Sequence, residues 1–364
     1  MSLSVGIVGL PNAGKSTLFN ALTAAGATVG NYPFTTIEPN TGVVAVPDRR
    51  LDQLAQLFSP PKVIAATVTF TDIAGLVRGA SRGEGLGNKF LGHIRECDAI
   101  ALVVRDFEDS DITHVEGNVD PVRDVDVVEL ELELADLETV TKRLEKAEKT
   151  VRLQKDKESA AEAIAVLQRV REHLDSGAPV RTMDLGAPER AILHDLWLLT
   201  ANPLVVVVNV AENARSAEPS AAIRQRAAQS GADVVVISAR IESELAELDP
   251  ADREAFLADL GIAEPGLDLL ARHAHRLLDL VTFFTAGEKE VRAWELRSGL
   301  TALDAAGVIH TDFAKGFIRA EVCDAEDLLS ARSYNAVREQ GKQRLEGRDY
   351  VVRDGDVVHF RFNV

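Results

Sequence analysis

Residues 9–17 read Gly-Leu-Pro-Asn-Ala-Gly-Lys-Ser-Thr, and this stretch decides the fold of the chain. It follows an apolar, strand-like run from Val5 to Val8 and opens an amphipathic run from Thr17 to Leu22. Glycines at a strand-to-helix turn let the backbone direct its N–H groups at a polyphosphate, and the helix N-terminus adds positive potential there. The stretch therefore predicts a phosphate-binding loop, or P-loop.

The side chains of the P-loop have predictable partners. Lys15 is expected to reach the β- and γ-phosphates of a nucleotide, and the Ser16 hydroxyl is expected to be a ligand of Mg²⁺. We expect nucleotide contacts from the whole loop, namely from Asn12, Ala13, Gly14, Lys15, Ser16 and Thr17.

The composition is that of a globular protein with more than one core. The chain has 364 residues, of which 46% are hydrophobic and 27% are charged, so two or three domains are expected. No apolar run approaches 18 residues, and the N-terminus leads straight into the first strand, so we expect a cytoplasmic protein without a membrane span. The two cysteines, Cys97 and Cys323, fit no disulfide or zinc spacing, which agrees with a reducing compartment.

The loop after the P-loop carries a second expected Mg²⁺ ligand. Residues 30–40 read Gly-Asn-Tyr-Pro-Phe-Thr-Thr-Ile-Glu-Pro-Asn, which is neither helical nor alternating and is punctuated by proline. In P-loop NTPases the equivalent loop is switch I, where a threonine hydroxyl completes the Mg²⁺ shell only when the γ-phosphate is present. We expect Thr36 to have this role.

A second phosphate-sensing segment follows the β-rich run from Ala66 to Thr71. Residues 72–75 read Asp-Ile-Ala-Gly, an arrangement in which Asp72 can hold a Mg²⁺-bound water and the Gly75 N–H can meet the γ-phosphate. The glycine-rich residues 76–88 are predicted to be switch II, because glycines make a rearrangement easy when the γ-phosphate leaves.

Three later apolar runs complete a nucleotide-binding sheet. Residues 98–104, 204–208 and 233–237 have the length and composition of buried parallel strands, and they alternate with helices. This alternation predicts an α/β fold with a doubly wound parallel sheet, whose sites lie at the carboxyl ends of the strands. The residues expected there, around the nucleotide base, are Asn209, Val210, Glu212, Ser238 and Ala239.

A helical hairpin is predicted as an insertion into this domain. Its apolar positions recur every seven residues among charges, which is typical of an antiparallel coiled coil, although a buried helix pair would give a similar pattern. These positions are Leu130, Leu137, Leu144 and Val151, followed after a polar break by Ala160, Leu167 and Leu174.

The first arm and tip of the hairpin are basic in an acidic chain. The formal net charge of −17 argues against a broad nucleic-acid surface and against DNA as a partner. The tip cations are predicted to lie on the exposed side, where they could contact rRNA phosphates, with an ordinary solvated helix face as the alternative. They are Lys142, Arg143, Lys146, Lys149, Arg152, Lys155 and Lys157.

A separate small domain is predicted after Leu280, where short β-like runs are separated by Gly and Asp turns. The predicted division is a nucleotide-binding domain in two parts, residues 1–128 and 200–280, with the helical insertion at 129–199 and the C-terminal domain at 281–364. The β-like runs of the last domain are Thr282–Phe284, Val291–Trp294, Phe317–Val322, Tyr350–Val352 and Val357–Phe362.

Together these motifs resemble the YchF subfamily of Obg-like P-loop NTPases. The resemblance covers nearly the whole chain and rests on the P-loop, Tyr-Pro-Phe-x-Thr-Ile-x-Pro-Asn at 32–40, Asp-Ile-Ala-Gly-Leu-Val at 72–77 and Gly-Glu-Gly-Leu-Gly-Asn at 83–88. Further matches are Asp-Ile-Thr-His-Val-Glu-Gly at 111–117, Phe-Phe-Thr-Ala-Gly at 283–287, Ile-His-Thr-Asp-Phe-x-Lys-Gly-Phe-Ile at 309–318 and Asp-Gly-Asp at 354–356. Ala13 departs from the family, which often has Val there.

The resemblance implies a Ras-like nucleotide domain, a coiled-coil insertion and a C-terminal ubiquitin-like (β-grasp) TGS domain. It also implies hydrolysis of ATP and binding to the ribosome or its large subunit, with an rRNA contact through the coiled coil or the TGS domain. In the family the residue aligned with Val210 contacts adenine, and in relatives an asparagine placed like Asn12 helps to hold K⁺ beside the phosphates.

The strand end at residues 209–212 favours ATP over GTP. Guanine-specific proteins carry Asn-Lys-x-Asp there, and the Asp carboxylate accepts two hydrogen bonds from guanine. This chain has Asn-Val-Ala-Glu, so the carboxylate of Glu212 is one methylene longer and the lysine is missing. A buried site that misplaces such a pair loses discrimination, whereas Asn209 or the Val210 backbone could receive the adenine amine.

Hydrolysis is predicted to be slow and switch-like. Leu76 occupies the position where Ras-type proteins place a water-orienting glutamine, and a leucine cannot hydrogen-bond water. His114 is the candidate for this task, because an imidazole can orient water or accept its proton and the resemblance places its loop near the site. The predicted catalytic residues are Lys15, Gly75 and His114.

Three alternative functions agree with parts of the sequence. A GTP-preferring translational GTPase would share the phosphate-binding motifs. A metabolic P-loop kinase would need a second substrate pocket with an arginine-rich lid, and nothing after Asp72 supplies one. An RNA-binding scaffold with vestigial ATPase activity would need a basic surface, against which the acidic charge argues.

Overall fold

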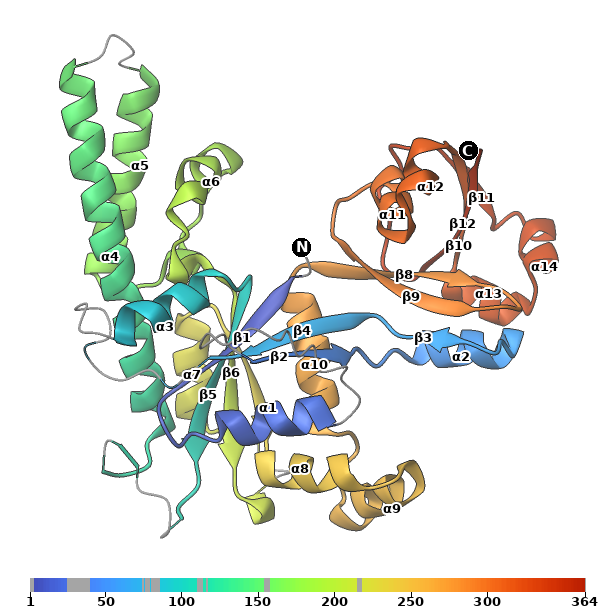
Figure 1. Ribbon diagram of the computed structural model, residues 1–364, viewed down its shortest axis with the longest axis horizontal. Helices are drawn as coiled ribbons and strands as arrows, with labels where there is room; N and C mark the ends of the chain where they lie inside the picture. Colours follow the sequence, from blue (N-terminus) through green and yellow to red (C-terminus); the bar gives the residue numbers. More distant parts are fainter. Residues whose placement is uncertain are drawn as a thin grey trace. The chain divides into compact units, whose positions relative to one another are not determined.

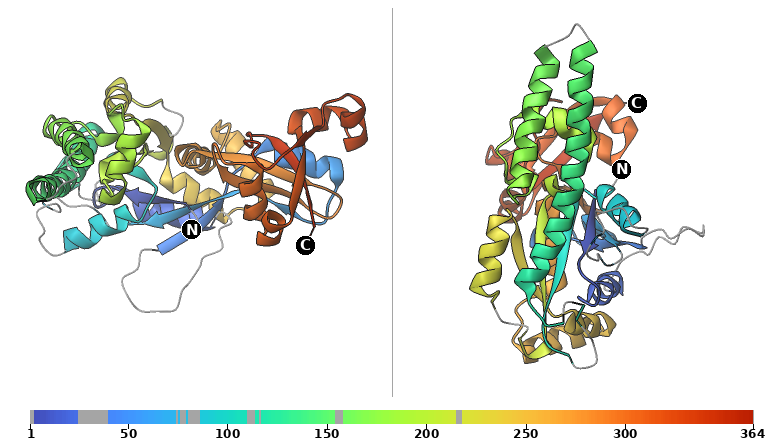
Figure 2. Two further views of the ribbon diagram at one scale, coloured as in Figure 1. Left: turned by 90° about the horizontal axis from the view of Figure 1, so that it is seen from above. Right: turned by 90° about the vertical axis from the view of Figure 1, so that its left-hand side faces the viewer.

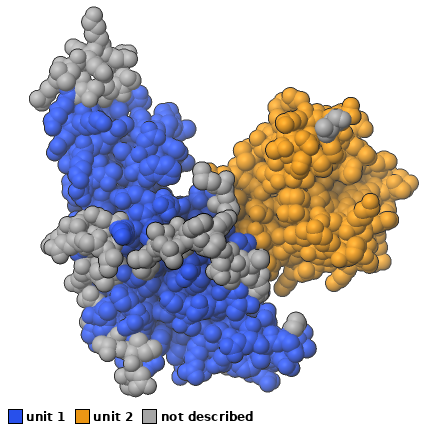
Figure 3. All heavy atoms as spheres, in the orientation of Figure 1, with its two compact units in different colours: residues 1–44, 69–270 blue, residues 45–68, 271–364 orange. Residues whose placement is uncertain are grey.

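The computed structural model describes residues 3–24, 40–73, 75, 79, 86–109, 114–115, 117–153, 158–214 and 218–363. The chain divides into two compact units, which are coloured separately in Figure 3. The first unit comprises Met1–Val44 and Thr69–Leu270, and the second comprises Ala45–Val68 and Ala271–Val364.

The first unit is built around a six-stranded sheet with the order β2-β4-β1-β5-β6-β7 (Figure 1). Its strands are β1 (Ser4–Val8), β2 (Asn40–Ala45), β4 (Thr67–Asp72), β5 (Ala99–Asp106), β6 (Leu204–Val210) and β7 (Asp233–Ile237). Strand β1 pairs in parallel with β4 and β5, and β6 pairs in parallel with β5 and β7. Every residue of β6 is buried, which explains why it is a continuous apolar run. The predicted α/β fold is confirmed.

Helices pack against this sheet. The helices of the first unit are α1 (Lys15–Ala24), α3 (Leu86–Arg95), α4 (Pro121–Leu153), α7 (Ala221–Gln229), α8 (Ala239–Glu247) and α9 (Pro250–Leu260), and α10 (Gly266–Leu277) begins in the first unit and ends in the second. Leu102 of β5 and Val206 of β6 share a core with Ile94, Val128 and Ile223, which come from α3, α4 and α7. Residues on the opposite side of the same strands are buried as well, as expected for a doubly wound sheet. The carboxyl ends of the parallel strands therefore meet at one edge.

The predicted helical hairpin is formed by α4 and α5 (Glu158–Asp175), which lie side by side in Figures 1 and 2. Leu144, Leu167 and Leu174 are buried in one core, as predicted, together with Val140 and Val170. Short segments that follow the hairpin contribute further residues to this core, from η2 (Val180–Thr182), α6 (Ala187–Leu193) and the residues before η4 (Leu199–Ala201).

One position of the predicted seam is wrong. Leu130 is 52% exposed, because the first half of α4 packs against the sheet rather than against α5. That half uses Val128 and Leu132, and a residue midway between two positions four apart points to the opposite side of a helix. The seam starts at Leu137, which is partly buried in the hairpin core. The side chains of Val151 and Ala160, the other predicted seam positions, lie outside the described residues.

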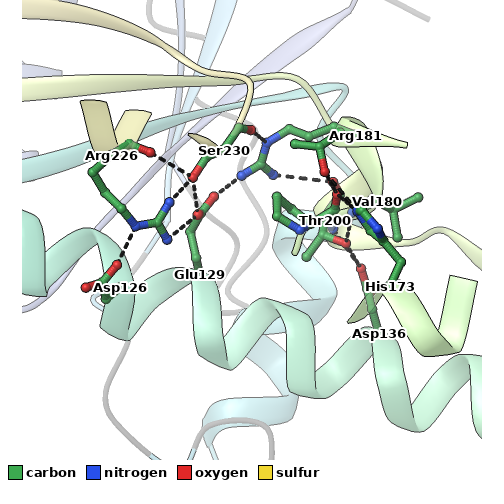
Figure 4. A network of polar contacts seen from close by, with 11 residues as sticks. Asp126, Glu129, Asp136, His173, Val180, Arg181, Thr200, Arg226 and Ser230 are labelled. Carbon is green, nitrogen blue, oxygen red and sulfur yellow. Dashed lines mark hydrogen bonds and ion pairs between the residues drawn. The ribbon is translucent and has the colours of Figure 1, made fainter. Parts of the chain in front are cut away.

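A buried polar network joins α4 to the rest of the first unit, and Figure 4 shows it. Glu129 accepts hydrogen bonds from Arg181, Arg226 and Ser230. The side chains of Glu129 and Arg181 are only 2% and 6% exposed, so removing one partner would leave an uncompensated buried charge. We call this network the hairpin root, and it comprises Glu129, Asp136, Arg181, Thr200, Arg226 and Ser230.

Asp136 is the second carboxylate of the hairpin root and is 0% exposed. Its oxygens accept hydrogen bonds from the backbone N–H groups of Leu199 and Thr200, at 2.9 and 2.7 Å, and from Thr200 Oγ1 at 2.7 Å. Burial raises the pKa of Asp136 to about 6, although its hydrogen bonds oppose this shift. Asp136 thus fastens η4 to α4.

The second unit has its own six-stranded sheet with the order β11-β10-β12-β8-β9-β3. Strands β8 (Leu280–Ala286) and β9 (Val291–Arg297) are antiparallel, as are β10 (Phe317–Asp324) and β12 (Asp356–Phe362). The run at 350–352, predicted as a strand, contains a β-bridge from Val351 to Thr301. The other elements are β3 (Val63–Ile64), β11 (Arg344–Glu346), α2 (Arg49–Phe58), α11 (Ala302–Ile309), α12 (Thr311–Lys315), α13 (Ala325–Ala331) and α14 (Tyr334–Glu339).

Residues 45–68 belong to this second unit, although the predicted nucleotide-binding segment 1–128 includes them. Leu51 and Leu54 of α2 are buried in one core with Phe284 and Val291, and β3 pairs in parallel with β9. The apolar face of α2 is thus completed by residues from the far end of the chain, which no local pattern reveals. The four-part domain division and the ubiquitin-like character of residues 281–364 remain predictions. No helix within the described ranges is long and apolar enough to span a membrane.

Candidate functional site

A cavity of about 640 Å³ lies beside the P-loop at the carboxyl ends of β5, β6 and β7. It brings together two groups of residues that the sequence predicted separately, the P-loop and the strand ends expected to hold a base. The predicted residues that line it are Asn12, Gly14, Lys15, Ser16, Thr17, Asn209, Val210, Glu212, Ser238 and Ala239. Ala13 is 2% exposed and contributes its carbonyl oxygen to Asn209.

The backbone of the P-loop depends on its glycines. Gly9 and Gly14 have φ angles of 154° and 94°. A Cβ atom at Gly9 would lie 2.3 Å from the Val103 carbonyl oxygen, and one at Gly14 would lie 2.2 Å from Asn209 Nδ2. The end of the cavity lined by residues 209–212 and 238–240, where a base is predicted to bind, is called the base end. A larger residue at Gly9 would displace the loop from β5, and one at Gly14 would displace it from the base end, so glycine is required at both positions.

Lys15 begins α1 and is 7% exposed. Its Nζ donates a hydrogen bond to the Leu10 carbonyl oxygen at 2.7 Å. Burial lowers the pKa of Lys15 to about 8, and the Asp72 carboxylate opposes this shift. A buried ammonium group at a helix N-terminus favours an anionic ligand, because the anion restores the electrostatic stabilisation that water would supply.

Ser16 and Asp72 meet between the start of α1 and the end of β4. Ser16 Oγ donates to Asp72 Oδ2 at 3.4 Å, and burial raises the pKa of the Asp72 carboxyl group. Gly75 also approaches the P-loop, since a Cβ atom there would lie 3.2 Å from the Pro11 nitrogen and 3.3 Å from Lys15 Nζ. Hydroxyl and carboxylate oxygens beside a phosphate site are the donor set that Mg²⁺ prefers, so these residues fit the ion.

Asn209 ties two walls of the cavity together. Its Nδ2 donates to the Ala13 carbonyl oxygen at 3.0 Å, and its Oδ1 accepts from the Ala239 N–H at 3.0 Å. The residue is 5% exposed. We expected Asn209 or the Val210 backbone to receive an adenine amine. The structure engages both ends of the Asn209 amide in holding the loops, which favours other acceptors for a base.

Glu212 forms an ion pair with Arg240 at the base end of the cavity, with 2.7 Å between Oε1 and Nε. The two side chains are 47% and 75% exposed, so the pair adds little to the free energy of unfolding. The pair matters for nucleotide binding, because it engages the Glu212 carboxylate at the position where guanine-specific proteins have an aspartate that binds guanine.

One wall of the cavity, formed by residues 107–109, was not predicted from the sequence, and neither were the lining residues Ala211 and Arg240. Phe107 is supported by Arg105, whose Nε donates to the Phe107 carbonyl oxygen at 2.9 Å and whose guanidinium lies 4.6 Å from the centre of its ring. A signal for this wall existed: neighbouring parallel strands end at the same sheet edge, so the loop after residues 98–104 had to lie near residue 209.

His114 is placed against α4, and among the described residues it does not line the cavity. It is 7% exposed, and its Nε2 lies 2.9 Å from Asp124 Oδ2 in the first turn of α4. Thr36 and Leu76 lie outside the described residues. The roles given to His114 and Thr36 therefore remain predictions.

Known proteins are similar to this chain over its whole length. Residues 4–130 match the family MMR_HSR1, described as a 50S ribosome-binding GTPase, and residues 280–363 match YchF-GTPase_C, described as a protein of unknown function (DUF933). The chain is 52% identical to the ribosome-binding ATPase YchF of Bacillus subtilis (strain 168) and 49% identical to that of Escherichia coli O157:H7, with 100% of each protein covered. The solved structure of the Schizosaccharomyces pombe YchF GTPase is 37% identical and superimposes with a TM-score of 0.88, over 99% of this chain and 98% of that one. Since sequence and fold agree over the full length, the chain belongs to the YchF family of P-loop NTPases.

Proposed function

We propose that this chain is an ATPase that hydrolyses ATP to ADP and phosphate as a slow conformational switch, and that it binds the ribosome through the large subunit. Curated relatives that match it from end to end are named ribosome-binding ATPases. The observation that carries the enzymatic part is the cavity that unites the P-loop with the 209–212 loop. Phosphate release from ATP without any acceptor is the test: release excludes a strict kinase, and a complete lack of turnover would favour the scaffold alternative.

The preference for ATP over GTP rests on the base end of the cavity. Guanine needs an acceptor for its N1–H and 2-amino groups and a donor for its 6-oxygen. The carboxylate of Glu212 is paired with Arg240, and the N–H of Ala239 is already donated to Asn209. The polar edge of guanine would therefore lack partners in this cavity, and such unpaired groups weaken the binding of GTP relative to ATP by roughly several kcal/mol. We expect ATP to bind at least tenfold more tightly than GTP in equilibrium titrations, and the opposite order would favour the GTPase alternative.

The phosphate end supplies the groups that hold the reacting part of ATP. P-loop NTPases generally use Mg²⁺, which neutralises charge on the β- and γ-phosphates. In our proposal Lys15 would exchange the Leu10 carbonyl for phosphate oxygens and the Gly75 N–H would meet the γ-phosphate. The Ser16 hydroxyl and Thr36 would hold the metal directly, and Asp72 would hold it through water. Asn12 is proposed to help hold K⁺ beside the phosphates, and equal turnover rates in K⁺ and Na⁺ would argue against that role.

His114 is proposed to position the attacking water. Its Nε2 lies 2.9 Å from Asp124 Oδ2, and a carboxylate partner on one ring nitrogen fixes the tautomer and orientation of an imidazole that acts through its other nitrogen. Replacing His114 with Ala should lower the single-turnover rate about a hundredfold if the imidazole acts as a general base. An unchanged rate would remove His114 from the mechanism.

The ribosome contact is proposed to use the basic arm of the hairpin. Lys142, Arg143, Lys146 and Lys149 are exposed on α4, whereas Leu144 between them is buried. Reversing the charge of Lys146 and Lys149 should weaken ribosome binding and flatten its log–log salt dependence by about two units, one per cation. Reversing Arg224, an exposed cation on α7, is the control. Equal binding by all variants would move the contact to the C-terminal unit.

A further inference from the structure

Ser238 carries a buried hydroxyl at the nucleotide cavity. It is 5% exposed and lines the base end of the cavity. Among the described residues its Oγ has no hydrogen-bond partner. Leaving a buried hydroxyl unpaired costs free energy, so such a group in a native structure calls for an explanation, and a ligand is one.

The place of Ser238 in the fold makes this lack of a partner informative. Ser238 is the N-cap residue of α8, a position where a serine hydroxyl ordinarily accepts a hydrogen bond from an N–H in the first turn. No such bond forms within the described part of the chain. Ser220 shows the ordinary case, because at the N-cap of α7 its Oγ accepts from the Ile223 N–H at 3.3 Å. The helix thus does not use the Ser238 hydroxyl, and the residue that carries it lines the cavity.

Two pairs of polar groups at this end of the cavity are already engaged. Asn209 Oδ1 and the Ala239 N–H are bonded to each other, and the Glu212 carboxylate is paired with Arg240. A base that enters the cavity could therefore give Ser238 Oγ its first hydrogen bond. A bond of this kind is worth more to the ligand than one that has to displace an existing protein contact.

We propose that Ser238 Oγ accepts a hydrogen bond from the 6-amino group of adenine and is a specificity-determining residue of the cavity. This inference rests on the proposed function, because it takes ATP as the ligand. A hydroxyl can turn its proton aside and present a lone pair to an amine. Purine has only a C–H at the same position and offers nothing to this oxygen.

The inference is tested by titrating the wild-type protein and the Ser238→Ala variant with ATP and with purine riboside 5′-triphosphate, which lacks the amine. Loss of the amine should weaken binding to the wild-type protein about five- to tenfold, and Ser238→Ala should weaken ATP binding by a similar factor. The variant should bind the two nucleotides equally, because the serine and the amine contribute through one shared bond. A variant that still loses five- to tenfold with the amine would overturn the inference.

A matched substitution separates a ligand role from a structural one. Ser220→Ala removes a serine that does cap its helix, so it should lower the melting temperature of the nucleotide-free protein and leave nucleotide discrimination unchanged. Ser238→Ala removes a hydroxyl that has no partner within the described ranges, so it should leave that melting temperature unchanged or raise it. A fall as large as that for Ser220→Ala would show that Ser238 is structural. If the wild-type protein bound neither triphosphate, the proposed function would fail, whereas tight ATP binding without coupling to Ser238 would reject this inference alone.

Discussion

The hairpin root and the nucleotide cavity both bury polar side chains within the first unit, and they treat them in opposite ways. In the root, Asp136 is 0% exposed and receives three hydrogen bonds from Leu199 and Thr200. In the cavity, Ser238 is 5% exposed and receives none from the described residues. Polar groups that the protein pairs itself stabilise the fold, and polar groups that it leaves unpaired are available to a ligand. Substitutions in the two regions should therefore separate stability from binding.

The largest effect is expected in the cavity, at Lys15. Replacing Lys15 with Ala should weaken ATP binding on the order of a thousandfold, because charge-assisted hydrogen bonds to phosphates are lost. The nucleotide-free protein should lose little stability, since burial already disfavours the charged ammonium. Isothermal titration and thermal unfolding without nucleotide measure the two quantities. A large loss of stability with intact affinity would reverse the comparison.

The opposite result, a loss of stability with little change in ATP affinity, is expected in the hairpin root. Replacing Asp136 with Ala leaves the N–H groups of Leu199 and Thr200 unpaired and should lower the free energy of unfolding by about 4 kcal/mol, with ATP affinity nearly unchanged. Denaturant unfolding measures the loss. Asp126→Ala is the control on the same helix, because its carboxylate is 54% exposed and its pairing with Arg226 should be worth at most about 1 kcal/mol.

The pH dependence of the free energy of unfolding tests whether burial or hydrogen bonding dominates at Asp136. The native pKa of Asp136, about 6, lies above the ordinary value of 3.8, so between these values the unfolded chain loses its proton while the native one keeps it. Raising the pH from 4 to 6 should therefore lower the stability of the wild-type protein, relative to Asp136→Asn, by roughly 2 kcal/mol. Urea unfolding of both proteins across this range tests the sign. A relative gain in stability would mean that the hydrogen bonds outweigh burial.

The smallest of these effects should come from Asn209, which belongs to both categories. Its amide is paired within the protein, yet it lines the cavity and fixes the loop at Ala239. Replacing Asn209 with Ala should weaken ATP binding about tenfold and also lower the melting temperature by a few degrees, because two hydrogen bonds are lost. Nucleotide titration and thermal unfolding of one sample test whether both quantities change.

The parts of the fold that could be predicted from sequence are those with local causes. Glycine and lysine at fixed spacing after a β run predicted the P-loop, and the run Asp233–Ile237 coincides with β7. Leu130 was misplaced because heptad spacing continues along α4 while the packing partner changes from sheet to helix. Phe107 and Arg240 carry no motif, and they enter the cavity only because the sheet brings their loops to one edge. That Ser238 Oγ has no hydrogen-bond partner in the described part of the chain likewise depends on three-dimensional contacts that spacing cannot specify.

Residues 45–68 affect how the protein assembles during its own synthesis. They leave the first unit after β2 and complete the second unit, whose other part starts at Ala271. A translating ribosome must add about 200 more residues before the first of these partners exists, and at roughly 5–20 residues per second this takes about 10–40 s. During this interval the apolar side of α2, with Leu51 and Leu54, lacks the core that later buries it. The apolar side of α2 therefore lacks its packing partners during most of chain elongation. A chaperone that covers this side, or a change in translation rate, can influence the yield of folded protein.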